Sequence, residues 1–144
     1  MEKNRIMIDT SAYAAFFRGH VGVKMSLQQA DEIFLNPIII GELIAGFSMG
    51  KQETRNRSIL QEFLSSARVQ TLVIDEETAE RYGAIVSYLR RKGTPISTND
   101  LWIAASAMQH GLKILTTDKH YAEIPQVITE YYQPKGKAVI GELR

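Results

Sequence analysis

Two aspartates stand at points where a ligand would bind if the flanking residues fold as strands. Asp9 follows the apolar run 6–8, and Asp118 follows the run 114–117, which is two apolar residues and two threonines. Both runs have the character of short buried strands, and ligands bind at the carboxyl ends of strands in open α/β sheets. Either aspartate taken singly could equally begin a turn or cap a helix. Together they indicate a site at one edge of a sheet.

Two further acids, Glu42 and Asp100, fall on the apolar stripes of predicted helices. Two isoleucines precede Glu42 by three and four positions, and an isoleucine and an alanine follow Asp100 by three and four positions. A carboxylate among apolar neighbours must find a cation, a hydrogen-bond donor or a proton. The helix dipole would account for Asp100 on its own, and a buried salt bridge to an arginine would account for Glu42.

These four carboxylates can converge on one crevice, where they would repel one another. A hard divalent cation relieves that repulsion, and an all-oxygen ligand set favours Mg²⁺ or Mn²⁺. Two ions would balance four carboxylates, whereas one ion would leave the pocket acidic and ready to take a second with the substrate. The chain has no cysteine, which excludes disulfides, thiolate metal sites and cysteine nucleophiles. We therefore expect one or two Mg²⁺ or Mn²⁺ ions.

The elements that must position these acids alternate along the chain. Strands are predicted at 6–8, 33–35, 69–74, 112–115 and 127–132, and helices at 11–18, 37–50, 51–66, 75–92 and 99–111. The polar stretch 24–31 carries no predicted element. Short strands that alternate with helices of about 12 to 18 residues predict an α/β sandwich with a mostly parallel sheet of about five short strands.

Length and composition place the chain among ordinary globular proteins. Its 144 residues suit a single domain spanning 1–144, and hydrophobic and charged residues make up 44% and 23%. The net charge of +1 gives no indication of a nucleic-acid partner. Neither a signal-peptide pattern nor an apolar run of about 18 residues is present, so we expect a cytoplasmic protein with no membrane partner. No role can be assigned to the tail 133–144.

Three segments carry a family resemblance: IMIDTSA with Asp9, GELIAG with Glu42, and NDLWIAASAMQHGLKILTTDKHY with Asp100 and Asp118. On these segments the chain resembles PIN-domain nucleases, and most of all the VapC-type toxins of prokaryotic toxin–antitoxin pairs. The resemblance spans almost the whole chain and implies a PIN-like three-layer fold. The chain departs from the family pattern at NPIIIG, before Glu42, where a hydroxyl-bearing residue is frequent.

The resemblance also implies an activity. It implies an endoribonuclease dependent on Mg²⁺ or Mn²⁺, in which water activated by the metal hydrolyses RNA phosphodiester bonds. Asp9, Glu42, Asp100 and Asp118 match the family's catalytic and metal-binding acids, and Ser11 and Thr116 match its accessory hydroxyl positions. The implied partners are an RNA substrate, a cognate antitoxin and a second copy of the chain in a homodimer.

An acidic pocket repels RNA, so positive charge must surround it. The candidate RNA-binding residues form two basic groups: Lys51, Arg55 and Arg57, and Arg90, Arg91 and Lys92. Each of them could instead be a solvated side chain or a helix-dipole partner. Two other functions stay open: a catalytically silent PIN-like scaffold that binds RNA or protein, and a phosphatase. The second has less support because no Asp-x-Asp pair follows the first strand.

Overall fold

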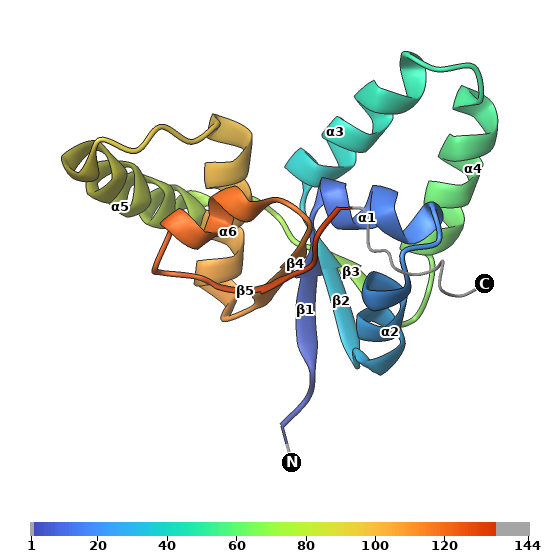
Figure 1. Cartoon of the computed structure of the whole chain (residues 1–144), viewed down its shortest axis with the longest axis horizontal. Helices are drawn as coiled ribbons and strands as arrows, with labels where there is room; N and C mark the ends of the chain where they lie inside the picture. The colour runs from blue at the N-terminus through green and yellow to red at the C-terminus, as the bar shows by residue number, and fades with distance from the viewer. Residues whose placement is uncertain (1, 135–144) are drawn as a thin grey trace.

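The computed structural model describes residues 2–134, which form a five-stranded sheet covered by helices (Figure 1). The strand order is β3-β2-β1-β4-β5, and every neighbouring pair is parallel. The strands are β1 (Arg5–Ile8), β2 (Glu32–Leu35), β3 (Val69–Thr71), β4 (Lys113–Thr116) and β5 (Ile128–Tyr131). The predicted parallel sheet of five short strands is therefore confirmed. From residue 135 on, the tail lies outside the described residues.

Helices lie on both sides of this sheet, as a three-layer fold requires (Figure 1). They are α1 (Thr10–Phe17), α2 (Val21–Gln29), α3 (Pro37–Ser48), α4 (Glu53–Leu64), α5 (Glu76–Lys92), α6 (Thr98–His110) and the short 3₁₀ helix η1 (Lys119–Glu123). The pair α5 and α6 lies apart from α1 to α4 in Figure 1, with the central strands between them. Within residues 2–134, none of the helices is long and apolar enough to cross a membrane.

Two sequence predictions need correction. The stretch 24–31, read as polar and without an element, lies mostly in α2. That helix begins where the His20 ring accepts a hydrogen bond from Val23 N at 3.2 Å, and it buries Val23, Ser26 and Leu27 at helical spacing. The third strand ends at Thr71 rather than at residue 74, because the neighbouring strand β2 ends at Leu35. Leu35 pairs with Thr71 and accepts the hydrogen bond of Leu72 N, so within the described part of the chain residues 73 and 74 have no strand beside them to pair with.

Local signals in the sequence set the ends of the site-bearing helices. Asp9 and Asn36 cap α1 and α3 by accepting hydrogen bonds from the backbone N–H groups of Ala12 and Ile39, at 2.8 and 3.0 Å. Gly111 ends α6 in the left-handed conformation, with φ of 64°. These caps fix where α1, α3 and α6 begin or end relative to the strands beside them.

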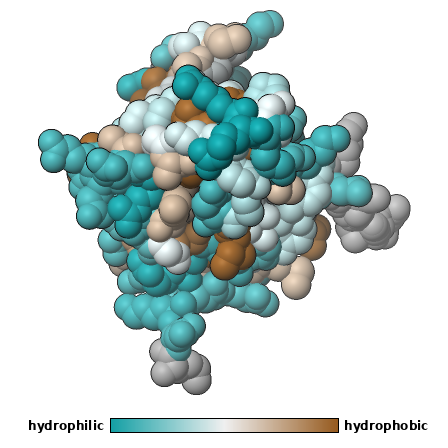
Figure 2. All heavy atoms as spheres, turned by 90° about the vertical axis from the view of Figure 1, so that its left-hand side faces the viewer, coloured by the Kyte–Doolittle hydropathy of each residue, from teal (hydrophilic) through white to brown (hydrophobic). Residues whose placement is uncertain are grey.

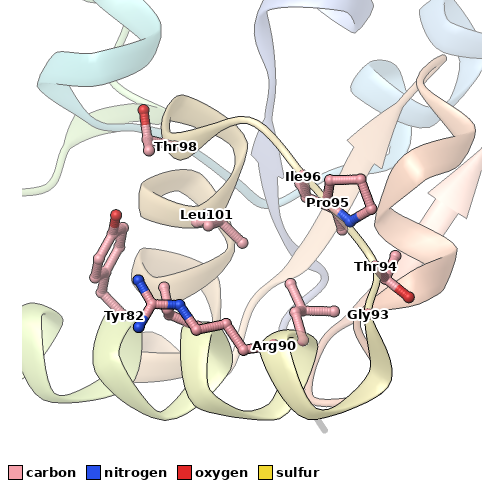
Figure 3. Close-up of a pocket in the computed structure, with 10 residues that line it drawn as sticks. Tyr82, Arg90, Gly93, Thr94, Pro95, Ile96, Thr98 and Leu101 are labelled. Atoms are coloured by element: carbon pink, nitrogen blue, oxygen red, sulfur yellow. The ribbon is translucent and has the colours of Figure 1, made fainter.

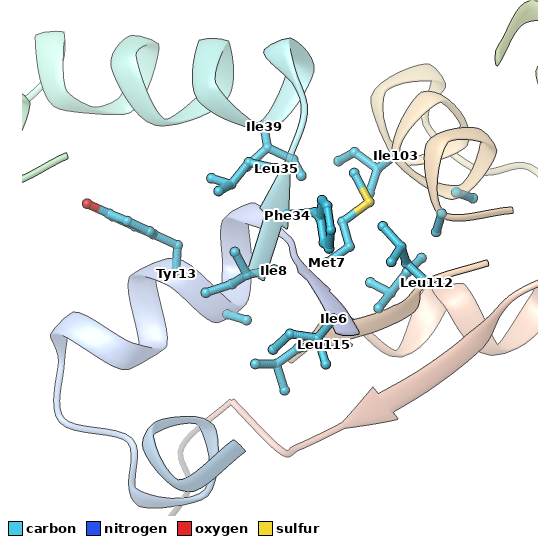
Figure 4. Packing of buried hydrophobic residues seen from close by; sticks show 14 of the residues in the cluster. Ile6, Met7, Ile8, Tyr13, Phe34, Leu35, Ile39, Ile103, Leu112 and Leu115 are labelled. Carbon is cyan, nitrogen blue, oxygen red and sulfur yellow. The ribbon is translucent and has the colours of Figure 1, made fainter. Parts of the chain in front are cut away.

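The two central strands are buried on both faces. Ile6, Met7 and Ile8 of β1 and Ile114 and Leu115 of β4 are at most 1% exposed. Figure 4 shows these strands packed between α1 and α3 on one side and α6 on the other. Strands that are buried in this way are rigid supports, so residues directly after β1 and β4 are held in defined positions.

One glycine of α2 lies against the last strand and gives a test of this packing. A Cβ at Gly22 would lie 2.6 Å from Cε1 of Tyr132, whose hydroxyl is fixed by hydrogen bonds to Glu130 and Ser26 at 2.9 and 2.7 Å. We expect Gly22→Ala to lower the free energy of unfolding by about 1–3 kcal/mol because the ring cannot move freely aside. Urea unfolding measures the change.

The matched control for this prediction is Gly83→Ala in α5. A Cβ at Gly83 meets no atom within 4 Å, so this variant should gain about 1 kcal/mol from helix propensity alone. Equal gains in stability for Gly22→Ala and Gly83→Ala would show that the Gly22 contact with Tyr132 is not a constraint.

Candidate active site

Asp9 is the most buried of the four predicted acids, at 3% exposed. Its Oδ1 accepts hydrogen bonds from Ser11 Oγ and Ala12 N, both at 2.8 Å, and its Oδ2 accepts one from Thr116 Oγ1 at 2.6 Å. Burial outweighs these stabilising donors and raises the pKa of Asp9 to about 6. The carboxylate is held in one orientation, but its charge is poorly solvated.

The two predicted accessory hydroxyls join the ends of β1 and β4 around Asp9. Thr116 Oγ1 donates to Asp9 and accepts from Asp118 N at 2.8 Å, while Ser11 Oγ accepts from Thr117 N at 3.0 Å. Each hydroxyl therefore links an aspartate or its flanking backbone to the neighbouring strand. Ser11 and Thr116 lie where the sequence placed them, beside the acids at the strand ends.

Glu42 and Asp100 are half-buried and each is held by a neutral donor. Glu42 accepts hydrogen bonds from the Thr10 hydroxyl and from Asn99 Nδ2, the latter at 2.9 Å. Asp100 Oδ1 accepts one from Tyr121 Oη at 3.2 Å. Burial raises the pKa of Asp100, and the nearby charges of Asp118 and Glu42 raise it further. This mutual influence is the repulsion expected of carboxylates brought together.

The proposed arginine partner for Glu42 is not found among residues 2–134, where Asp9, Glu42 and Asp100 form no ion pair. The stripe that carries Glu42 faces the core only in its first half. Ile39 is buried, whereas Ala45 and Gly46 are exposed, and the other buried residue of α3 is Leu43. The helix is turned so that Glu42 points into an open crevice, which a count of apolar neighbours could not show.

Asp118 lies at the edge of the site, where β4 passes into η1. Its Oδ1 accepts a hydrogen bond from His120 N at 2.9 Å and lies 2.9 Å from His120 Nδ1. His120 is an exposed side chain, whereas Asp118 is partly buried. Among residues 2–134, Asp118 is therefore the one acid of the four whose carboxylate contacts an imidazole.

All four acids line a single open crevice of about 530 Å³. The crevice is bounded by α1, α3, α6 and the residues after β4, and its other walls are Thr10, Ser11, Ala14, Ala45, Gly46, Met49 and Ile103. The polypeptide thus brings together carboxylates that are separated by up to 109 residues, since 118 − 9 = 109. Met49, at 87% exposed, forms an apolar rim.

The donor chemistry of this crevice fits a hard divalent cation, because it offers several carboxylates, and no lysine or arginine of the described part of the chain lines it. In the arrangement described for residues 2–134, however, no three carboxylate or imidazole groups are close enough to hold an ion. The acids point instead to Thr10, Thr116, Asn99 and Tyr121. The side chains are of the kind that binds a divalent cation, whereas in this arrangement they accept hydrogen bonds from neutral donors.

Three of these donors were not singled out as site residues by sequence reasoning. Thr10 and Asn99 are immediate neighbours of Asp9 and Asp100, so adjacency to a predicted acid was the available signal. Tyr121 carried no such signal, because its hydroxyl reaches Asp100 from η1, 21 residues along the chain. Only the packing of η1 against α6 could reveal it.

The two predicted basic groups do not line the crevice. Lys51, Arg55 and Arg57 are exposed at the turn after α3 and on the first half of α4, and Arg90, Arg91 and Lys92 are exposed at the end of α5. In Figure 1 the α3–α4 turn and the far end of α5 project on opposite sides of the centre of the molecule. The crevice therefore lies between two separate concentrations of positive charge.

Comparison with known proteins identifies the family. The family model described as "PIN domain" matches residues 6–127, a span that includes all four acids. The chain belongs to the PIN-domain family. It is 30% identical to Ribonuclease VapC4 of Mycobacterium tuberculosis over 132 residues, which cover 88% of this chain and 96% of that protein. The chain is thus a VapC-type ribonuclease, as the sequence resemblance implied.

Other relatives within the family agree. The tRNA(fMet)-specific endonuclease VapC of Salmonella typhimurium is 28% identical, with 88% of this chain and 96% of that protein covered. The structure of VapBC2 from Rickettsia felis bound to a promoter DNA fragment superposes with a TM-score of 0.79, at 27% identity, over 90% of this chain and 99% of that chain. The PIN-like fold predicted from the sequence is confirmed by this superposition.

Proposed function

We propose that the chain is an endoribonuclease dependent on Mg²⁺ or Mn²⁺, and that it acts as the toxin of a type II toxin–antitoxin pair. The observation that supports this proposal most directly is the crevice lined by Asp9, Glu42, Asp100 and Asp118 in a VapC-type ribonuclease. Carboxylates that are crowded and partly desolvated repel one another, and a bound divalent cation relieves that repulsion.

The four acids would hold one or two Mg²⁺ or Mn²⁺ ions, which supply water activation and charge neutralisation for phosphodiester hydrolysis. The protein's own contribution is to orient the ligands. Ser11 and Thr116 fix the two oxygens of Asp9, Thr10 and Asn99 fix Glu42, and Tyr121 fixes Asp100. Such outer hydrogen bonds set the direction of each carboxylate before substrate arrives.

The Tyr121 hydroxyl gives a separate test of this orienting role. Tyr121→Phe removes the donor to Asp100 Oδ1 and leaves the buried ring in place. We expect ribonuclease activity to fall roughly tenfold, as is typical when an outer partner of a ligand is lost. As the activity falls, the Mn²⁺ concentration needed for half-maximal activity should rise. Tyr131→Phe, at an exposed position of β5, is the control and should change neither quantity.

RNA would approach through the positive charge on either side of the crevice. We assign phosphate contacts to Lys51, Arg55 and Arg57 and to Arg90, Arg91 and Lys92, all of which are exposed. Contacts of this kind bind without regard to sequence and weaken as salt rises. They would hold the RNA backbone across an acidic centre that by itself repels it.

We also propose a cognate antitoxin and a homodimer. Support for the antitoxin comes from the solved relatives: the Rickettsia felis and Salmonella typhimurium structures are VapBC complexes, at 27% identity each and TM-scores of 0.79 and 0.75. An antitoxin for this chain would have to cover the acidic crevice or the RNA path to it in order to block cleavage.

The proposed function is tested by incubating the purified protein with single-stranded RNA and Mn²⁺ or Mg²⁺, and then with excess chelator. Cleavage that requires the added ion and stops with chelator is the expected result. RNA that binds but stays intact at every metal concentration would support a silent scaffold instead. Hydrolysis of a phosphomonoester without RNA cleavage would support the phosphatase alternative. Arrest of growth on expression of the chain alone tests the toxin role.

A further inference from the structure

A second cavity, separate from the acidic crevice, lies between α5, α6 and the loop that joins them. It measures about 520 Å³ and is walled by apolar side chains, among them Leu89, Pro95, Ile96 and Leu101. Figure 3 shows Tyr82 at one side of this cavity and the side chain of Arg90 extending from α5 towards it. We refer to it as the α5–α6 pocket.

Among the residues that the structure describes, Arg90 is the only charged one in the lining of this pocket, and no acid lines it. Among residues 2–134, the Arg90 guanidinium forms no ion pair. The surrounding face of the molecule is largely hydrophilic in Figure 2, with small hydrophobic areas between polar ones. A cavity with apolar walls, one free guanidinium and no negative charge suits a flat ligand that carries or adjoins an anion.

An aromatic ring is held in place at the wall of the pocket. Tyr82 stacks on Trp102, with ring centroids 4.1 Å apart and planes inclined by 20°. A ring fixed in this way loses little conformational freedom when a second planar group packs near it. Aromatic rings and arginine guanidinium planes are the surfaces on which proteins stack unpaired nucleobases.

The α5–α6 pocket and the acidic crevice share one helix. Thr98 and Leu101 of α6 line the pocket, while Asp100 and Ile103 of the same helix line the crevice. The two pairs are offset by two positions and so lie roughly 160° apart around the helix axis, on opposite sides of α6. A strand of RNA that reaches both the crevice and the pocket would have to cross the N-terminal end of α6. Tyr82 and Arg90 come from α5, so the pocket can bind RNA without altering the acids.

We infer that the α5–α6 pocket binds an unpaired nucleotide of the RNA substrate, across α6 from the acidic crevice, with its base against the apolar wall and Tyr82 and its phosphate near Arg90. This inference rests on the proposed ribonuclease function and adds a substrate subsite to it. Arg90 thereby differs from its neighbour Arg91, which is also exposed and charged but does not line the pocket.

The test compares Arg90→Ala with Arg91→Ala in the full-length protein, using single-stranded RNA. The two variants lose the same charge, so a general electrostatic effect would be equal in both. We expect Arg90→Ala to raise KM about tenfold with kcat nearly unchanged, because it removes the phosphate contact of the bound nucleotide. Arg91→Ala should raise KM only about twofold, as for loss of one general phosphate contact on the RNA backbone.

Trp102 supplies a second readout that does not depend on catalysis, because it is the only tryptophan of the chain and stacks on Tyr82. In chelator, RNA should quench tryptophan fluorescence in the wild type and in Arg91→Ala, and much less in Arg90→Ala at the same RNA concentration. Equal KM values and equal quenching in the two variants would overturn the pocket assignment.

The remaining outcomes are also decisive. If the wild type cleaves RNA and Arg90→Ala changes only the sedimentation of the protein, the pocket is a contact between two copies of the chain and the nucleotide assignment is wrong. If the wild type does not cleave RNA, the proposed function itself fails. The wild-type cleavage assay therefore separates the failure of the subsite from the failure of the function.

Discussion

Asp9→Asn should abolish RNA cleavage while leaving the protein folded. The substitution removes a carboxylate oxygen from the crevice, and loss of a direct ligand should reduce activity by more than the roughly 100-fold that outer partners account for. The fold should survive because Oδ1 of asparagine can still accept from Ser11 and Ala12, and its amide can donate to Thr116 Oγ1. The measurement is ribonuclease activity with Mn²⁺ beside urea unfolding. Asp118→Asn should behave in the same way.

The control for this prediction is Asp31→Asn, which makes the same chemical change at an exposed position before β2. Asp31 accepts a hydrogen bond from Asn4 N and does not line the crevice. The ribonuclease activity of Asp31→Asn should match that of the wild type. Full activity in Asp9→Asn would remove Asp9 from the catalytic site, whatever the geometry of the crevice.

In the metal-free protein, Asp9 should lower the free energy of unfolding as pH rises. The pKa of Asp9 is about 6 in the folded protein and 3.8 as its ordinary value. Between these values the unfolded chain has released a proton that the folded chain retains. The contribution of this group is therefore fully present below pH 3.8 and is lost as pH rises through about 6, a change of about 3 kcal/mol.

The difference between wild type and Asp9→Asn isolates this effect from the other carboxylates, whose titration is common to both proteins. In chelator, the free energy of unfolding of Asp9→Asn relative to wild type should increase by about 2 kcal/mol between pH 4 and pH 7. Urea unfolding at the two pH values gives the measurement. A difference that is the same at both would mean that Asp9 is not strained by burial in the folded state.

The local parts of this fold could be predicted because the signals lie within a few residues of one another. The apolar run of β1, Pro37 at the start of α3 and Gly111 at the end of α6 each act on their own neighbours. Helix α2 was missed because its apolar residues are few and its first turn is capped by the His20 ring, a less familiar capping group.

The position of the four acids at strand ends and on helix faces singled them out as candidates, but it did not indicate their hydrogen-bond partners. From the sequence, a salt bridge between Glu42 and an arginine was one possibility, whereas in the structure Glu42 accepts hydrogen bonds from Thr10 and Asn99. A side chain's partner depends on the rotation of its helix, and the rotation of α3 is set by how Ile39 and Leu43 pack. The hydrogen bond from Tyr121 to Asp100 likewise depends on how two elements pack, and local sequence does not indicate it.

The sequence by itself determined the alternation of strands and helices, the absence of thiol chemistry and the four carboxylates that suit a divalent cation. Only the tertiary structure decided that these carboxylates share one crevice, which hydroxyl or amide holds each of them, and that Arg90 rather than Arg91 lines a second cavity. The reason is that propensity and periodicity act over short stretches of chain, whereas convergence depends on strand order and helix packing, which join residues far apart.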